Sequence, residues 1–295
     1  MSRPENGRRC KSCLLYDGMR FYLIRDVLPT DLLEGFHIAA DGVCSICHAY
    51  RDAYDRGGIE RDLELFRRST AGVHRPAALL ALSGGKDSMS ALYLARRVLR
   101  LDLVALLFDN GFVPREVVAR ARRACASLQV ELEVVRAPAR WRQSFGDAVD
   151  AAGLSSPPPC NVCGAEIIEA LADRAAALGT PWVIWGTNYF AAWTDRPSAV
   201  GRRLLSAGRQ LAEINLPYAM QIKAAAARAN AKRLGATPVA IPGVSTNCLV
   251  PHQVARALLP TLGHVPELEV LALEVIVGHC SRRAALRTLR ERTTP

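Results

Sequence analysis

The residues with the clearest capacity for chemistry form a glycine-rich run, Ser83-Gly84-Gly85-Lys86-Asp87-Ser88. The run follows a short apolar segment (77–82) that predicts a buried strand, and it precedes a segment with helical character that extends to about residue 100. Glycines let backbone N–H groups approach phosphate oxygens closely, and a helix N-terminus adds partial positive charge. Lys86 supplies a mobile cation, and Asp87 suits a magnesium ion beside the phosphates. The run therefore predicts a loop that binds the phosphates of a magnesium nucleotide.

This loop lacks the spacing of a Walker A motif, and it resembles the PP-loop of the ATP pyrophosphatases. That family includes tRNA thiolases, tRNA lysidine synthases and several amide-forming enzymes. The resemblance implies a parallel α/β sheet of the HUP type and attack of a substrate oxygen on the α-phosphate of ATP. Pyrophosphate leaves, and a nucleophile then displaces AMP. It also implies an ATP site, with Lys86 and Asp87 in catalytic roles, made of Leu82, Ser83, Gly84, Gly85, Lys86, Asp87, Ser88, Asp109 and Gly186.

Four of the nine cysteines form two C-x-x-C pairs near the N-terminus, Cys10 with Cys13 and Cys44 with Cys47. Four thiolates brought together by two tight turns make a closed tetrahedral site of the kind that structural zinc requires. Replacement of one cysteine by His37 or His48, an iron–sulfur site, or no metal at all are the alternatives. A zinc ion here would stabilise a module of about 50 residues that is too small for a core of its own.

Three further cysteines, Cys160, Cys163 and Cys248, form a second set with a different spacing. A C-x-x-C pair beyond the PP-loop followed by a lone cysteine is similar to the cluster-dependent tRNA thiolases. That resemblance implies a 4Fe–4S cluster on the three cysteines with one iron left open for sulfide, and catalytic roles for Cys160 and Cys248. Without iron, the same residues would carry a persulfide and resolve it as a disulfide. A second zinc knuckle, or burial without function, is the remaining alternative. We expect these cysteines to lie in loops, one after three prolines (157–159) and one at the end of residues 243–248.

Two features point toward a different branch of the same superfamily. The tRNA thiolases carry a G-H-x-x-D-D motif after the fourth strand, whereas residues 186–191 here are GTNYFA. The N-terminal cysteine pairs, with the sequence DGVCSIC at residues 41–47, resemble the N-acetyl sugar amidotransferases. Ammonia is then the alternative nucleophile, with a sugar or another small acceptor.

The remaining cysteines predict packing and not chemistry. Cys125 lies on an amphipathic helix whose arginines at 120, 122 and 123 are expected to face outward. Cys280 and its neighbour His279 are expected to be a core pair within a helix. Neither residue has a partner cysteine at metal-ligand spacing.

The pattern along the chain predicts a zinc module (1–52), a helical linker (53–75), a PP-loop domain (76–250) and C-terminal helices (251–295), of which we expect two. Apolar strands at 77–82, 103–108, 130–135 and 181–185 alternate with helices, which is typical of a parallel sheet covered on both faces. Residues 223–234 predict an alanine-rich helix. Ligands of such sheets lie at the carboxyl ends of the strands.

The basic composition indicates an anionic partner but does not identify it. With 38 Lys and Arg against 28 Asp and Glu, the formal net charge is +10, which suits a nucleotide, RNA or acidic metabolite. Arginines 202, 203 and 209 and those of the C-terminal helix would contact such a partner, unless they are only a solvated surface. No membrane span or secretory signal is predicted, so we expect a cytoplasmic protein.

These observations together predict an ATP-dependent sulfurtransferase. Its cofactors would be ATP, Mg²⁺, Zn²⁺ and a 4Fe–4S cluster, and its acceptor a tRNA base or a small metabolite. Further partners would be a sulfur-donor protein and a second copy of the chain. The rival predictions are an amidotransferase and a non-catalytic ATP- or RNA-binding protein.

Overall fold

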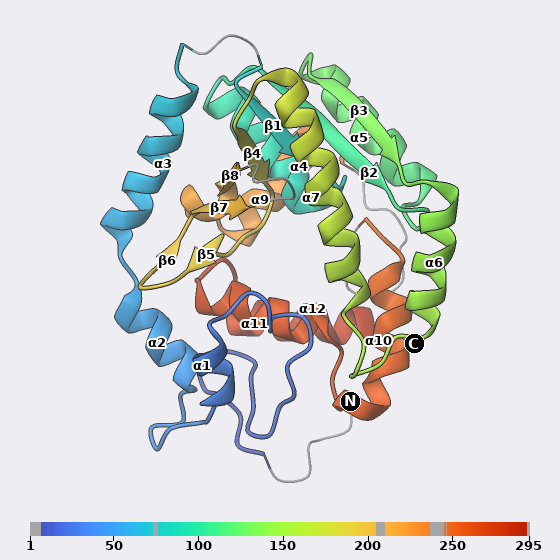
Figure 1. The fold of residues 1–295 in the computed structure, drawn as a ribbon. Helices are drawn as coiled ribbons and strands as arrows, with labels where there is room; N and C mark the ends of the chain where they lie inside the picture. The colour runs from blue at the N-terminus through green and yellow to red at the C-terminus, as the bar shows by residue number, and fades with distance from the viewer. Residues whose placement is uncertain (1–6, 73–75, 205–209, 237–244, 246, 294–295) are drawn as a thin grey trace.

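A computed structural model of the 295-residue chain describes residues 7–72, 76–204, 210–236, 245 and 247–293. A six-stranded sheet lies at its centre, with helices on both faces and a cysteine-containing segment at one end (Figure 1). In the part of the chain that is described, no helix combines the length and apolar character needed to cross a membrane.

The central sheet is parallel except at one edge. Its spatial order is β3-β2-β1-β4-β8-β7, and only the last pair is antiparallel. The strands are β1 (Ala78–Ala81), β2 (Leu103–Asp109), β3 (Glu131–Arg136), β4 (Trp182–Trp185), β7 (Val200–Leu204) and β8 (Gln210–Asn215). The chain winds outward from β1 to β3 and then returns to the other side of β1, so the topological switch point lies between β1 and β4, where a ligand site is expected.

The four parallel strands predicted from the sequence are present, and β7 and β8 are additions. A small hairpin of β5 (Ala192–Trp193) and β6 (Pro197–Ser198) precedes them. The sequence signal for β7 was weak because Arg202 and Arg203 interrupt its apolar pattern. Arg203 forms an ion pair with the buried Glu213 at 3.0 Å, and residue 209 lies outside the described part.

Side chains of β1 alternate between two cores. Leu79 and Ala81 pack with Leu171 and Ala175 of α7 (Pro159–Leu178) on one face. Ala78 and Leu80 belong to the larger core on the opposite face. That face is covered by helices that include α4 (Lys86–Tyr93), α5 (Arg115–Ser127), α8 (Leu216–Ala219) and α9 (Ala224–Arg233). Burial on both faces explains why the parallel strands are continuously apolar in sequence.

The segment after the glycine-rich run is helical nearly to residue 100, as predicted. Its α-helix ends at Tyr93 and continues as a π-helical turn, η1 (Leu94–Val98). The C-terminal region has three described helices instead of two, because glycines with positive φ, Gly263 and Gly278, separate them. These helices are α10 (Val250–Leu262), α11 (Glu267–Ile276) and α12 (Arg282–Thr293), and the other helices are α1 (Thr30–Glu34), α2 (Ser45–Ala53), α3 (Arg56–Thr70) and α6 (Ala139–Asp150).

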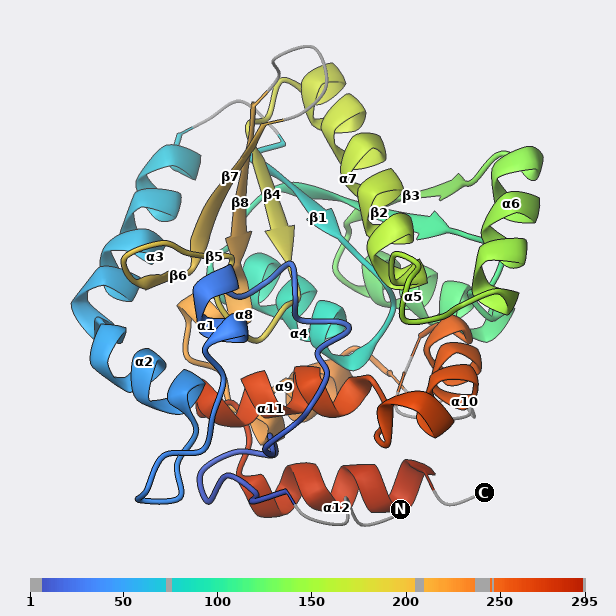
Figure 2. The same ribbon diagram turned by 60° about the horizontal axis from the view of Figure 1, so that its bottom comes forward.

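The N-terminal segment folds back onto the C-terminal helices, as Figure 2 shows. Glu269 of α11 is fully buried, and its carboxylate accepts backbone N–H groups of Tyr22, Leu23 and Ile24 at 2.8–3.2 Å. His264 contacts the same carboxylate at 3.2 Å. A carboxylate that accepts several backbone N–H groups fixes those donors in place, so α11 anchors the chain between the two cysteine pairs.

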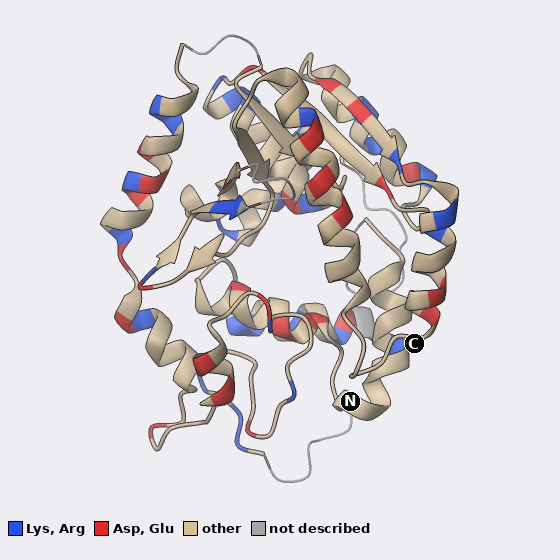
Figure 3. Ribbon diagram, viewed as in Figure 1, with Lys and Arg blue, Asp and Glu red and all other residues tan. Residues whose placement is uncertain are grey.

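Charged side chains do not collect on one face of α3, where basic and acidic residues are interspersed (Figure 3). Ion pairs join Arg56 to Glu60 at 3.0 Å and Arg68 to Glu64 at 2.7 Å. This part of the charge is a solvated helix surface, where each exposed pair contributes little to stability.

Candidate functional site

The glycine-rich run lies at the switch point of the sheet, between the end of β1 and the first turn of α4. The loop closes on itself, since the Ser83 and Ser88 hydroxyls are 3.0 Å apart and the Gly85 N–H donates to the Ser83 hydroxyl at 3.3 Å. The first N–H groups of a helix have no acceptor within the helix. The loop and the start of α4 together are suited to hold an anion.

Two glycines allow the backbone to pack closely here. Gly84 has a φ of +72°, and a Cβ there would lie 2.7 Å from Val117 of α5. Gly186 directly follows β4, and a Cβ on it would lie 2.5 Å from Cα and 2.6 Å from N of Ser88. Because backbone atoms cannot move aside cheaply, Gly186 is required for β4 to end against the loop.

Arg120 of α5 contacts the loop. This corrects the expectation that the Arg120 side chain faces outward. It is 5% exposed, and its guanidinium donates to the Gly84 carbonyl. Helical periodicity places Arg120 beside Arg122 and Arg123 in sequence but on another face of the helix. This contact was not predictable from local pattern, because its acceptor is a backbone atom 36 residues away along the chain.

Lys86 and Asp87 form a pair at the mouth of the loop, with 2.5 Å between the ammonium and one carboxylate oxygen. Burial alone lowers the pKa of Lys86, but the carboxylates of Asp87 and Glu274 outweigh it and raise that pKa above its usual value. The other oxygen of Asp87, Oδ1, is buried and has no hydrogen-bond partner in the described chain. A buried unpartnered carboxylate oxygen beside a phosphate-type loop fits a magnesium ligand.

At the end of β2, Asp109 and Asn110 make different contacts. Asp109 accepts the Gly111 N–H at 3.0 Å and pairs with Arg136 at 3.3 Å, and it does not line the cavity described below. Its neighbour Asn110 does line it, and the Asn110 amide nitrogen lies 3.3 Å from the sulfur of Cys163 and 3.7 Å from that of Cys248. Asn110 thus connects the two parts of the second cysteine set.

Cys160 and Cys163 lie in the first turn of α7 and not in a loop, which corrects the sequence prediction. Pro159 is the first residue of that helix, a position where the missing N–H of proline costs nothing. The three prolines therefore lead into a helix start. Cys248 precedes α10, outside any helix, as expected.

The three thiols are neutral when no cation is bound. Burial raises the pKa of Cys160 to about 12 and that of Cys163 to about 11, and burial also raises the pKa of Cys248. Hydrogen bonds from Asn110 act in the opposite direction on Cys163 and Cys248. A coordinating metal would deprotonate such thiols outright.

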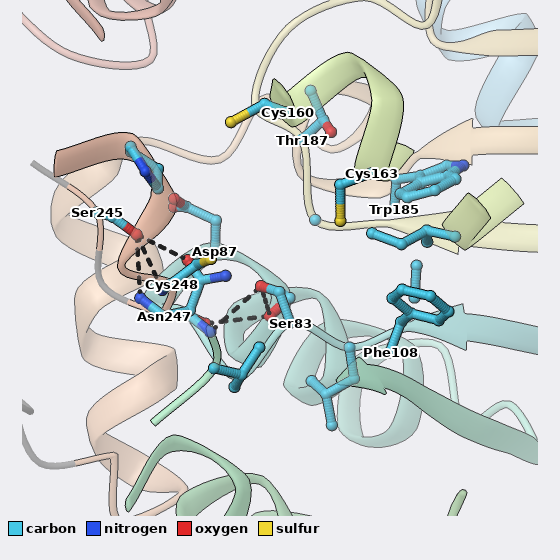
Figure 4. A pocket seen from close by; sticks show the side chains of 18 of the residues that line it. Ser83, Asp87, Phe108, Cys160, Cys163, Trp185, Thr187, Ser245, Asn247 and Cys248 are labelled. Carbon is cyan, nitrogen blue, oxygen red and sulfur yellow. Dashed lines mark hydrogen bonds between the residues drawn. The ribbon is translucent and has the colours of Figure 1, made fainter. Parts of the chain in front are cut away.

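A cavity of about 420 Å³ brings these parts together (Figure 4). Of the residues predicted for the site, Gly84, Lys86 and Asp109 do not line this cavity. The apolar part of the lining includes Leu106, Phe108 and Ile167. The predicted residues that do line it are Leu82, Ser83, Gly85, Asp87, Ser88, Cys160, Cys163, Gly186 and Cys248.

The first cysteine set forms a separate site at the N-terminus. The sulfur atoms of Cys10, Cys13, Cys44 and Cys47 all lie within 4.8 Å of one another, and two of the separations are 3.9 and 3.7 Å. A tetrahedral ion with metal–sulfur bonds of about 2.3 Å requires sulfurs about 3.8 Å apart. The four cysteines therefore fit a single metal ion better than a multi-iron cluster.

Neither histidine replaces a cysteine in this group. His37 contacts the Gly35 carbonyl, and His48 contacts Asp41 at 3.1 Å. Backbone N–H groups of Ser12 and Cys44 donate to the Cys10 sulfur at 3.4 and 3.3 Å. Hydrogen bonds among the four thiols lower the pKa of Cys10 and raise those of Cys13 and Cys47, and a bound cation would deprotonate all of them.

The two remaining cysteines are not part of a metal group in the described residues. Cys125 is 1% exposed in the core, as predicted. Cys280 and His279 are not in a helix, because α11 ends at Ile276, and they lie in the turn before α12. His279 is buried, but Cys280 is half-buried and lines a second cavity.

No family model matches the chain. It is 24% identical over 220 residues to an uncharacterized protein of Methanocaldococcus jannaschii, covering 74% of this chain and 73% of that protein.

Solved structures to which the chain is similar include an NMN synthetase from Francisella tularensis and an NH3-dependent NAD synthetase from Campylobacter jejuni. The first has a TM-score of 0.44 and 15% identity over 82% of this chain and 99% of its own. The second, a complex with nitrate, has a TM-score of 0.34 and 20% identity over 46% of this chain, and the match spans 58% of its own length, less than two thirds. Likeness at this level does not identify a function, which must come from the residues of this chain.

Proposed function

We propose that this chain is an ATP-dependent sulfurtransferase that adenylates an acceptor oxygen, releases pyrophosphate and replaces the oxygen with sulfur. One observation carries the proposal: the glycine-rich loop and three cysteines from distant parts of the sequence line the same cavity. A loop alone would support nucleotide binding, and cysteines alone would support a metal site. Their convergence supports a reaction that uses both.

ATP would bind with its phosphates on the loop. Ser83, Gly85 and the first turn of α4 would hold the phosphate oxygens, while Lys86 and a magnesium ion on Asp87 would balance their charge. The adenine would lie against the apolar wall of Leu106 and Phe108. Asp109 does not line the cavity. It would contribute by stabilising the turn after β2, which directs the Asn110 side chain toward the cysteines.

The acceptor's carbonyl-type oxygen would attack the α-phosphorus. The bond from that phosphorus to the bridging oxygen breaks, and pyrophosphate leaves with the electron pair. A sulfur nucleophile then attacks the activated carbon, and AMP leaves with the former acceptor oxygen. Fixed positive groups at the phosphates stabilise charge that develops in both steps, and binding in one cavity orients the reactants.

We propose that the second cysteine set binds an iron–sulfur cluster. Cys163 and Cys248 lie 3.3 and 3.7 Å from the same Asn110 nitrogen, so their sulfurs are at most 7.0 Å apart. Cys160 lies one helical turn from Cys163 on α7 and lines the same cavity. When bound by three thiolates, a 4Fe–4S cluster supplies one open iron for sulfide. Cys160, Cys163 and Cys248 would be its ligands, and Asn110 would orient two of them.

Ammonia transfer is the second candidate. The observation that favours it is the raised pKa of all three thiols, which leaves them neutral and unreactive if no iron binds. The loop would then activate the acceptor in the same way, and the cysteines would only pack.

The nucleotide products test the proposed reaction. Anaerobically purified protein would be given α-labelled ATP with sulfide or ammonia and, in turn, total tRNA or a metabolite extract. We expect AMP and pyrophosphate in equal amounts with sulfide, and loss of both in Lys86→Ala and Cys163→Ser variants. Formation of ADP, or equal activity of Cys163→Ser with ammonia alone, would contradict sulfur transfer. Absence of any nucleotide product with every acceptor pool would favour a non-catalytic role.

A further inference from the structure

A second cavity, of about 700 Å³, adjoins the first. It lies among the C-terminal helices near the carboxyl ends of the strands, a region that Figure 2 shows from below. Asp87, Cys160 and Tyr189 line both cavities, so the reacting end of a molecule in the second cavity would lie beside the loop. Its volume is within the range of about 300–1,000 Å³ that is usual for small-molecule sites.

The walls of this cavity are largely apolar. Val254 of α10 and Val270 and Leu271 of α11 line it from one side. Leu23 and Val27, which belong to the chain between the two cysteine pairs, line it from another. Apolar walls of this kind favour an occupant with an organic body.

Two arginines also line the cavity, Arg228 of α9 and Arg287 of α12, and they outnumber the one exposed acid in the lining, Glu291 of α12. Both are exposed, so they lie where the cavity meets solvent. In the described chain, neither guanidinium has a hydrogen bond or ion pair with another residue, whereas Lys86 in the same lining is paired with Asp87. Two unpaired guanidinium groups at the mouth of an apolar cavity match an anionic group on the occupant.

The acidic residues inside the cavity repel an anion less strongly than their number suggests. Glu267 lines the cavity, both of its carboxylate oxygens are buried without a partner in the described chain, and burial raises its pKa to about 7. Glu274 accepts a hydrogen bond from Asn188 at 3.2 Å. Glu267 thus carries a full negative charge only above neutral pH.

One wall of the cavity is fixed by the N-terminal segment. The side-chain amide of Asn161, next to Cys160, donates to Asp26 at 2.5 Å, and Arg25 donates to the Ser156 carbonyl at 3.4 Å. Together with the anchor on Glu269, these contacts hold Leu23 and Val27 against the cavity. The cavity is therefore a built part of the fold and not a gap between loosely packed helices.

We propose that the second cavity binds the acceptor, and that the acceptor is a small organic anion with an apolar body. Its carboxylate or phosphate group contacts Arg228 and Arg287, and its reacting oxygen lies at the Asp87–Cys160 boundary between the cavities. The role of the occupant as acceptor rests on the proposed function. The binding of the anion itself does not depend on ATP, iron or sulfur.

Phenylacetate and phenylacetamide are suitable probes because they share shape and differ in charge. Their affinities would be measured by calorimetry on the full-length, metal-loaded protein without nucleotide. We expect phenylacetate to bind about tenfold more tightly than phenylacetamide. In the Arg228→Ala/Arg287→Ala variant that ratio should fall to about one, because only the charge contacts are removed. Arg283→Ala, on the same helix but outside the cavity, is the control and should keep the ratio.

A cavity-filling variant tests the location independently. Ala284 of α12 lines the cavity, and Ala284→Phe should weaken both probes about tenfold. Equal affinities in the wild type, no binding of either probe, or an unchanged ratio in the double arginine variant would overturn the proposal. Since both arginines are exposed, the double variant keeps the test valid even if Ala284→Phe fails to fold. Loss of AMP formation with intact phenylacetate binding would instead refute the proposed function alone.

Discussion

The two cysteine sets place their sulfur atoms in different surroundings. At the N-terminus, four sulfurs lie within 4.8 Å of one another, and three of the cysteines are fully buried. Beside the glycine-rich loop, three cysteines on two segments line an open cavity, and a side-chain amide, Asn110, contacts two of them. A closed, tightly spaced set fits a structural ion, whereas an open set leaves room for a reaction.

The difference also shows in what each set holds together. The N-terminal set is linked to α12 through Arg282, which donates to the Cys13 carbonyl at 2.7 Å, and the chain between its two pairs is anchored on α11. The cysteines of the second set pack in a smaller apolar cluster with Tyr22 and Phe145, and they also line the cavity beside the loop. Loss of the first set should therefore affect folding, and loss of the second should affect chemistry.

The largest effect that separates the two sets is on stability. Structural zinc contributes about 10–16 kcal/mol to the folding of small zinc modules, so Cys44→Ser should lower the melting temperature by about 15 °C or more, or give insoluble protein. Cys163→Ser, whose residue does not belong to the four-sulfur group, should stay within about 3 °C of the wild type. Thermal unfolding of the two variants side by side checks this, and similar losses in both would contradict the division.

Local patterns predicted the N-terminal cysteine group, but not the helical position of Cys160 and Cys163 or the long-range contacts. The C-x-x-C pairs and the run at 83–88 carry their geometry in neighbouring residues, so ligand grouping and the strand–loop–helix setting followed from the sequence. Arg120 was expected outside because its acceptor, the Gly84 carbonyl, is distant in sequence. The second cavity could not be foreseen, because its lining comes from α9–α12 and from residues 23 and 27.

The next largest expected effect is the pH dependence of stability that comes from Glu267, a buried acid close to the second cysteine set. The pKa of Glu267 is raised from 4.5 to about 7, so its protonated form is favoured by folding. Stability from this group is full below pH 4.5 and is lost as the pH rises through 7, by up to about 3 kcal/mol. Glu267→Gln should therefore stabilise the protein more at pH 8 than at pH 5. Denaturant unfolding at both pH values tests this, with the exposed Glu291→Gln as control; a gain that does not change with pH would contradict it.

The loop itself should tolerate no added methyl group at its contact with β4. Gly186→Ala places a Cβ about 2.5 Å from the Ser88 backbone, and such overpacking costs about 1–3 kcal/mol. ATP affinity measured by calorimetry should fall at least about tenfold. Gly164→Ala on α7, where an added Cβ meets nothing within 4 Å, should leave affinity unchanged. Equal affinities for both variants would show that ATP does not depend on this packing.

The smallest expected effect sharpens the comparison within the second set. Asn110→Ala removes the donor to Cys163 and Cys248, and loss of such an outer partner typically weakens metal binding about 10–100-fold. Iron should then be lost faster to a chelator, while the zinc content stays the same. An unchanged rate of iron loss would mean that Asn110 only shapes the loop after β2.

The most direct test measures the metal and acid-labile sulfide content of anaerobically purified protein. It tests whether the first cysteine set binds zinc and the second binds an iron–sulfur cluster. Wild-type protein should contain one zinc with about four irons and four sulfides per chain, and Cys163→Ser should lose the iron and sulfide while keeping the zinc. Zinc without iron in the wild type, or iron that persists in Cys163→Ser, would contradict the assignment of the second cysteine set to sulfur chemistry.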